Sequence, residues 1–97
     1  MATYVTLFKF TDQGLKNIKE SVKRVEATKR ELEAAGGKLK EVLSLQGEYD
    51  LLAIAEWDDE ASAMAMNLNV AKRGNAIPRT ARAFTVAEME KILTKVV

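Results

Sequence analysis

The chain of 97 residues contains no cysteine and no histidine. Without cysteine it forms no disulfide, and it offers no thiolate as a nucleophile or as a ligand for an iron–sulfur cluster. Without histidine it lacks the commonest general base, the commonest ligand for transition metals and the proximal ligand of small haem enzymes. Any catalysis by this chain is therefore restricted to Tyr, Lys, Arg, Asp, Glu or Asn side chains.

Neither sign of charge dominates, because 15 basic residues face 14 acidic ones and the net charge is +1. Nucleic acids and anionic membranes attract proteins through a one-sided positive field, so we expect neither as a partner. No run approaches the ~20 apolar residues that span a bilayer. No basic segment precedes the first apolar stretch, so we expect no secretory signal and a cytoplasmic protein.

A chain of this length predicts one domain, residues 1–97, with a core just large enough to fold. Residues 3–10 are rich in β-branched and aromatic types, which predicts a strand. Thr11 then offers a helix N-cap. Apolar residues at three- and four-residue steps predict one long amphipathic helix over residues 12–35, and a pair of glycines ends it.

Two strands follow. Alternation of apolar and polar residues over 38–46 predicts a half-buried strand, and Gly47-Glu48 predicts a tight turn into a second strand over 49–57. This second strand is apolar on both of its faces. A strand that is buried on both faces needs two covering layers, and the chain supplies only one layer of helices.

The remaining elements have clear boundaries. A second helix is predicted between Asp58-Asp59, which cap it, and Gly74-Asn75, which end it. A fourth strand runs from Pro78 to about Phe84, and its proline restricts it to an edge or first-residue position. Thr85-Val86-Ala87-Glu88 is a capping box that starts a short terminal helix.

The order β-α-β-β-α-β plus a terminal helix predicts an α+β, ferredoxin-like fold: an antiparallel sheet with both long helices on one face. We assign Leu52 and Ile54 to the face under the helices. That choice leaves the opposite face of the same strand uncovered: Tyr49, Leu51, Ala53, Ala55 and Trp57. An apolar row of this size on a monomer is an aggregation liability, so we expect a homodimer joined through its sheets, or a higher oligomer.

Several motifs of this chain together resemble the bacterial GYD domain family, small proteins of largely unassigned function. They are Tyr4-Val5, Phe10-Thr11-Asp12-Gln13-Gly14 with Lys16-Asn17-Ile18-Lys19, Gly36-Gly37-Lys38-Leu39, Gly47-Glu48-Tyr49-Asp50 and Arg82-Ala83-Phe84-Thr85. Here the signature reads Gly-x-Tyr-Asp, because Glu48 separates the glycine from the Tyr-Asp pair. The resemblance implies a dimeric α/β barrel and no particular reaction. That fold class includes cofactor-free monooxygenases, haem enzymes and non-catalytic ligand binders.

Four residues are candidates for binding a ligand: Tyr49, Asp50, Trp57 and Arg82. Tyr49 either lies at the mouth of the barrel, where its phenol donates to a ligand or acts as an acid, or packs its ring in the interface while Asp50 bonds backbone N–H groups of the turn. Arg82 either holds a carboxylate bidentately inside the cavity or pairs with an acid such as Asp50 or Glu56.

The second helix carries two apolar strips. The wider one contains Ala61, Met64, Ala65, Leu68 and Ala71, and we assign it to the core. The narrower one, with Ala63, Met66 and Val70, lies on the other side and hints at a further contact, because a globular helix normally has one such strip.

No cofactor and no metal are expected. The acidic residues at 56–60 stand at a junction between strand and helix, where capping and the helix dipole explain them, and they lack the spacing of an EF-hand.

Three functions remain open. The preferred one is a non-catalytic, oligomeric module that binds a small, partly apolar or carboxylate ligand, with Tyr49, Trp57 and Arg82 lining the cavity. The next is a purely structural protein that assembles with itself. The last is a cofactor-free oxygenase or isomerase using Tyr49 and Asp50 for proton transfer, with a carboxyl or phenol pKa moved toward neutrality. No catalytic residue is assigned.

Overall fold

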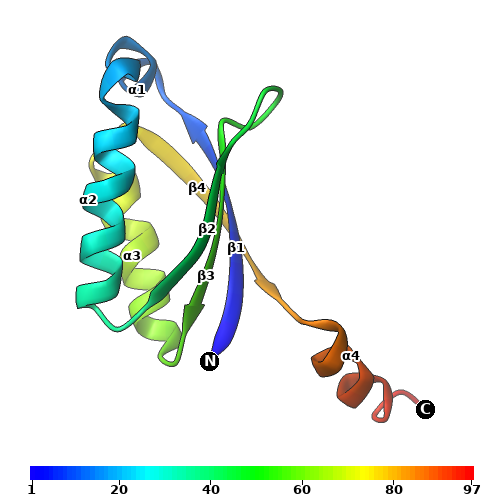
Figure 1. Cartoon of the computed structure of the whole chain (residues 1–97). Helices are drawn as coiled ribbons and strands as arrows, with labels where there is room; N and C mark the ends of the chain where they lie inside the picture. The colour runs from blue at the N-terminus through cyan, green and yellow to red at the C-terminus, as the bar shows by residue number, and fades with distance from the viewer.

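A computed structural model describes all 97 residues. The elements are β1 (Ala2–Phe10), α1 (Asp12–Lys16), the 3-10 turn η1 (Ile18–Glu20), α2 (Ser21–Ala34), β2 (Lys38–Ser44), β3 (Leu51–Trp57), α3 (Glu60–Lys72), β4 (Ala76–Ala83) and α4 (Val86–Leu93). The four strands form one sheet in the order β2-β3-β1-β4, and every neighbouring pair is antiparallel. Helices α2 and α3 cover one face of this sheet (Figure 1). The predicted α+β, ferredoxin-like fold is confirmed, and β4, which contains Pro78, is an edge strand as predicted.

The single long helix predicted over residues 12–35 is wrong, because the helix is interrupted at Asn17. The Asn17 side chain donates to the carbonyl oxygen of Gln13 at 3.0 Å, and Arg24 donates to the carbonyl oxygen of Asn17 at 2.9 Å. Asparagine side chains compete with the helical backbone in this way. The break leaves α1 free to lie against the start of β4, where a Cβ on Gly14 would be only 2.0 Å from the carbonyl oxygen of Asn75.

The two faces of the sheet are the reverse of those predicted from the sequence. Trp57 is only 4% exposed and belongs to the buried cluster with Leu32 of α2, so its side chain points toward the helices. Leu52 and Ile54 therefore lie on the uncovered face. The assignment of Trp57 to the uncovered face was wrong because β3 is apolar on both sides, so its alternation does not say which side the helices cover.

Gly37 allows the chain to pass close to Trp57 as it leaves α2. A Cβ at Gly37 would come within 2.8 Å of both the Trp57 ring and the Leu32 side chain. Only glycine at this position lets the chain leave α2 and pass directly over the indole ring. The large ring is thus accommodated at the closed end of the helix layer.

Helix α3 is also rotated relative to the prediction. Ala63 and Met66 are buried against the sheet and Val70 packs beside them, whereas Met64 and Leu68 are 57% and 56% exposed. The narrower apolar strip is therefore the core strip. The connection between β3, which ends at Trp57, and α3, which begins after the Asp59 cap, is short, so it fixes the rotation of the helix regardless of which strip is wider.

The uncovered side of the sheet is mainly apolar. Register pairs Leu7 with Leu52 and Val5 with Ile54, which places these four side chains together at its centre. We call this side the bare face; its apolar residues are Val5, Leu7, Leu43, Leu52, Ile54, Ile77, Ala81 and Ala83. Helix α4 projects from the end of β4 on the side of the sheet away from α2 and α3 (Figure 1). None of the helices has the length and apolar character needed to cross a membrane.

Candidate functional site

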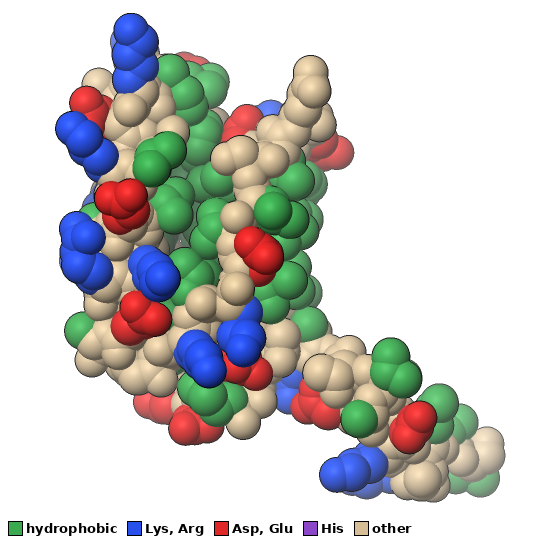
Figure 2. Space-filling view, viewed as in Figure 1, with side chains coloured by type: hydrophobic (Ala, Val, Ile, Leu, Met, Phe, Trp, Pro, Cys, Tyr) green, Lys and Arg blue, Asp and Glu red, His purple; other side chains and the backbone are tan.

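An open cleft separates the helix layer from the sheet. Helix α2 packs mainly over the edge strand β2, and α3 packs mainly over the opposite edge strand β4. The space left between them, above the central strands β1 and β3, has a volume of about 900 Å³. Figure 2 shows this hollow, with hydrophobic side chains along it. We call it the helix–sheet cleft.

The lining of the cleft is predominantly apolar, with 20 hydrophobic residues among 32. Its floor is formed by alternate residues of the two central strands: Tyr4, Thr6, Phe8, Leu51, Ala53 and Ala55. Trp57 closes one end together with Leu32 and Met66. A concave, apolar site of roughly 300–1,000 Å³ with a few polar groups is typical of sites for small molecules.

The cleft is also lined by polar groups, and two of them, the Tyr4 hydroxyl and the Arg24 guanidinium, have hydrogen-bonding capacity left for a ligand. Thr6 and Thr80 bond to each other through their hydroxyls at 2.8 Å. The hydroxyl of Tyr4, a half-buried residue of the floor, takes part in none of the side-chain hydrogen bonds of the chain. Arg24 also lines the cleft and donates to the carbonyl oxygens of Asn17 and Gly14 at 2.9 and 3.3 Å. A guanidinium has five N–H donors, so Arg24 retains donors for a ligand.

An ion pair joins the two helices at the cleft. Arg73, at the end of α3, donates to the Glu31 carboxylate of α2 at 2.6 Å, and both residues line the cleft. This hydrogen bond, together with the charges of Arg73 and Lys72, lowers the pKa of Glu31. A general acid or base works best when its pKa lies near the operating pH. Glu31 is therefore held as a structural carboxylate and is poorly suited to proton transfer near neutrality.

The structure brings only two of the four predicted site residues into this cleft. Trp57 and Arg82 line it, whereas Tyr49 and Asp50 lie in the connection between β2 and β3, outside it. Tyr4, which the sequence analysis did not single out, occupies the floor. The alternation of residues 3–10 places Tyr4 on the same side as Thr6 and Phe8. Tyr4 could therefore have been predicted as a site residue if the covered face had been assigned correctly.

Asp50 has a clear structural role. Its carboxylate accepts a hydrogen bond from the backbone N–H of Phe10 at 2.7 Å, and its own N–H donates to the carbonyl oxygen of Phe8 at 2.9 Å. Its carbonyl oxygen also accepts from the N–H of Leu45 at 2.8 Å. Asp50 thus ties the β2–β3 connection to the end of β1, at the point where the chain turns into α1.

Replacing Asp50 by alanine should destabilise the domain by about 1–3 kcal/mol, because it removes a charge-assisted hydrogen bond and leaves the Phe10 N–H without its acceptor. Urea unfolding followed by circular dichroism measures the loss. Asp58→Ala is the matched control, since Asp58 is exposed and its contact is a 3.8 Å ion pair with the terminal amine. Equal stability of the two variants would contradict the structural role.

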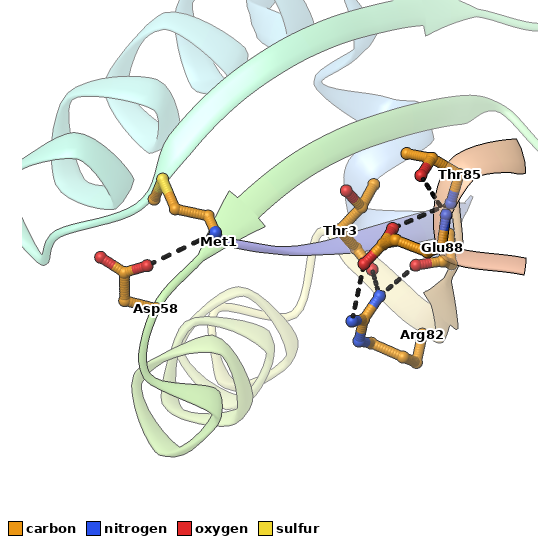
Figure 3. Close-up of polar contacts among 7 residues, drawn as sticks. Met1, Thr3, Asp58, Arg82, Thr85 and Glu88 are labelled. Atoms are coloured by element: carbon orange, nitrogen blue, oxygen red, sulfur yellow. Dashed lines mark hydrogen bonds and ion pairs between the residues drawn. The ribbon is translucent and has the colours of Figure 1, made fainter. Parts of the chain in front are cut away.

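Arg82 is engaged at the root of α4 (Figure 3). Its guanidinium donates to the carbonyl oxygens of Thr3, at 3.2 Å, and of Ala83, and it lies 3.6 Å from the Glu88 carboxylate. The acid that pairs with Arg82 is thus Glu88, while Glu56 pairs with Lys40 at 3.7 Å.

Glu88 itself forms the predicted capping box. Its carboxylate accepts from the Thr85 N–H at 2.9 Å, and the Thr85 hydroxyl accepts from the Glu88 N–H at 3.1 Å. The backbone hydrogen bond from Thr85 is the main cause that lowers the pKa of Glu88, and the charge of Arg82 adds to it. The carboxylate therefore stays charged at neutral pH, which keeps the Arg82–Glu88 pair intact.

Comparison with known proteins identifies a relative of this chain and the family to which the chain belongs. It is 28% identical over 90 residues to a protein of Thermus thermophilus described as a glutamine synthetase and cystathionine beta-lyase binding protein, covering 92% of this chain and 95% of that one. No solved structure matches the chain. The family model for the GYD domain matches residues 4–93. The sequence motifs, the ferredoxin-like fold and this match over nearly the whole chain agree: the chain belongs to the GYD domain family.

Proposed function

We propose that the chain is a non-catalytic binding module, a homodimer that holds a small, partly apolar carboxylic acid in the helix–sheet cleft. The observation that carries this proposal is the cleft itself, with its volume of about 900 Å³ and its largely apolar lining. An apolar ligand that enters this open cleft removes its apolar lining from water, which favours binding. The low pKa of Glu31 gives no support to a catalytic role.

The polar groups of the cleft indicate the kind of ligand. The hydroxyl of Tyr4 can donate to an oxygen of the ligand above the floor, and the remaining N–H donors of Arg24 suit a carboxylate. Arg24 also lies over the Phe10 ring, 5.8 Å from its centroid, which holds the guanidinium in place. Tyr4 and Phe10 lie six residues apart on β1, about 20 Å, so a ligand that reaches both groups is elongated, with its carboxylate at the Arg24 end and an acceptor oxygen at the Tyr4 end.

A thermal-shift screen of aromatic and branched aliphatic carboxylic acids tests this proposal. At least one should raise the melting temperature, and Tyr4→Phe should weaken its binding by roughly tenfold, the value of one lost hydrogen bond of about 1.4 kcal/mol. Tyr49→Phe is the matched control, because the same atom is removed outside the cleft. A screen without a single stabilising acid, or equal losses in both variants, would reject the site.

The homodimer is supported by the bare face. With a rise of about 3.4 Å per residue and about 4.8 Å between strands, its four strands cover roughly 500 Å². An apolar patch of about 300–600 Å² on a soluble protein is often functional, which supports an interaction at this face. Two of its charges lie at opposite edges, because Arg79 on β4 pairs in register with Leu7 and Glu41 on β2 pairs with Ile54, while Lys9 and Glu56 lie on the central strands of the same face. A surface with opposite charges at opposite edges is complementary to itself.

A second candidate is a protein that binds metabolic enzymes. It is favoured by the printed description of the Thermus thermophilus relative, which names two enzymes as its partners. Titrating this chain against glutamine synthetase and against cystathionine beta-lyase, with binding followed by interferometry, separates the two candidates. Binding of either enzyme with an unresponsive ligand screen would favour this second function.

A further inference from the structure

We propose that α4 is an arm that packs its apolar side against a second copy of the chain, beside the interface formed by the bare face. The inference deepens the proposed homodimer and rests on it. It assigns a role to the one helix that covers neither the sheet nor the other helices of its own chain (Figure 1).

Helix α4 is well specified at its start but has nothing to support it. The reciprocal hydrogen bonds of Thr85 and Glu88 fix its first turn. It contains only eight residues, whereas isolated helices shorter than about 12–15 residues are marginal in water. Most helical stability in proteins comes from packing an amphipathic face against another surface. The sequence thus encodes a helix whose supporting surface lies outside the chain.

The unsupported side of α4 is apolar. Val86 is 79% exposed and Leu93 is 57% exposed. Met89 and Val96 lie on the same side at helical spacing and are also exposed, as is Phe84 just before the helix. The polar residues Glu90 and Lys91 lie on other sides of the helix. A single apolar strip of this kind is typical of a helix that docks on a protein surface.

The direction of α4 is fixed by its root. Arg82 joins the carbonyl oxygen of Thr3 on β1 to the Glu88 carboxylate on α4 (Figure 3). Its guanidinium also lies over the Phe84 ring, 4.3 Å from the centroid. These contacts hold the helix at a set angle to the sheet. Because that angle places α4 on the side of the bare face, a partner seated on this face meets the arm (Figure 1).

The charges of the bare face select a second copy as that partner. A two-fold axis parallel to the strands lays β4 of one copy over β2 of the other. The register places Arg79 two residues, about 7 Å, from the level of Glu41 along the strands, a gap that a long arginine side chain can span, so one rotation brings two such pairs within reach. Neither residue has an ion-pair partner within its own chain. A foreign partner would have to supply both charges at matching positions, whereas the second copy supplies them by symmetry.

The area of the interface also calls for the arm. A stable interface buries about 800 Å² of accessible surface on each partner, and the bare face has a flat footprint of roughly 500 Å², so contacts made by α4 add to an interface of modest size. Helix α4 adds a strip about 12 Å long on each copy, given its rise of about 1.5 Å per residue. In a symmetric dimer α4 of each copy packs on the other copy, so the interface contains two such contacts.

The first test introduces one charge on either side of α4. Leu93→Glu places a carboxylate on the apolar side and should raise the dimer dissociation constant at least tenfold in sedimentation equilibrium. Ala87→Glu places the same group on the opposite side and should change it less than twofold. Both variants should keep the urea midpoint of dissociated wild type at low protein concentration, since α4 lies outside the buried core. Equal dissociation constants for the two variants would contradict the proposal that the apolar side of α4 packs against the second copy.

Hydrogen exchange on the unmodified chain gives an independent test. Amides of α4 should be protected above the dissociation constant and should exchange freely tenfold below it, while amides of β1 and β3 stay protected at both concentrations. Protection of α4 that does not change with concentration, or that appears only when another protein is added, would overturn the proposal. Failure of the arm leaves the ligand site standing, because the thermal-shift screen reports on the helix–sheet cleft alone.

Discussion

Replacing Trp57 by alanine is expected to cost about 3–5 kcal/mol of folding free energy, the usual range for truncating a buried tryptophan. Trp57 is 4% exposed and is the largest side chain of the buried cluster with Leu32, Ala63 and Met66. A domain of this size has only about 5–15 kcal/mol of stability in total. The variant should therefore unfold at much lower urea concentration, and the helix–sheet cleft should lose its closed end.

Met64→Ala is the matched control, because Met64 is a large apolar side chain of the same layer that is 57% exposed. Its loss should cost less than about 1 kcal/mol, as is usual for exposed positions. Urea unfolding of both variants, followed by circular dichroism, measures the difference. If Trp57→Ala instead kept the wild-type midpoint and merely dissociated the dimer, the tryptophan would lie in the interface and the assignment of the two sheet faces would have to be exchanged.

The sequence specifies where elements begin and end more clearly than which way they face. The N-caps Thr11, Asp59 and Thr85 each act through a local hydrogen bond, so they can be recognised from a few neighbouring residues. The face of β3 depends instead on what lies above it. Its period of two is visible in the sequence, but both of its sides are apolar.

Gly37 is a sequence signal for close packing near Trp57 that the alternation of β3 does not provide. Gly36, with φ of 99°, ends the helix in the left-handed conformation, so it accounts for one glycine of the pair. The second glycine has no such conformational role. It marks a close approach, which the structure identifies as the passage over the Trp57 ring. In this chain the first glycine of the pair ends the helix, and the second allows a close contact with a neighbouring side chain.

The site was less predictable than the fold. The helix–sheet cleft depends on the separation of α2 and α3, which arises from their packing over opposite edge strands, and no local sequence signal sets that separation. The Tyr49-Asp50 pair drew attention because it stands in a family motif. Asp50 acts at a distance in sequence, through the Phe10 N–H, so its motif reflects a long-range structural contact.

The second large effect is expected at Ile54. Ile54→Lys should weaken dimerisation at least 100-fold, because the bare face would bury two ammonium groups, one from each copy, and each would compete with Arg79 of the other copy for the neighbouring Glu41. Ile54 is paired with Val5 and Glu41 at the centre of the bare face, and its side chain points away from the buried core. The monomer should therefore remain folded, with a urea midpoint at low concentration close to that of dissociated wild type.

Sedimentation equilibrium of Ile54→Lys and of Leu15→Lys tests this expectation. Leu15 is an apolar residue of α1 that is 51% exposed and lies outside the bare face, so the same substitution there should leave the dimer intact. Loss of the dimer in both variants would point to a general effect of charge, and retention in both would remove the bare face as an interface. A monomeric Ile54→Lys protein that still binds the carboxylic acid would establish that each copy holds a complete cleft, because every residue assigned to the ligand comes from one chain.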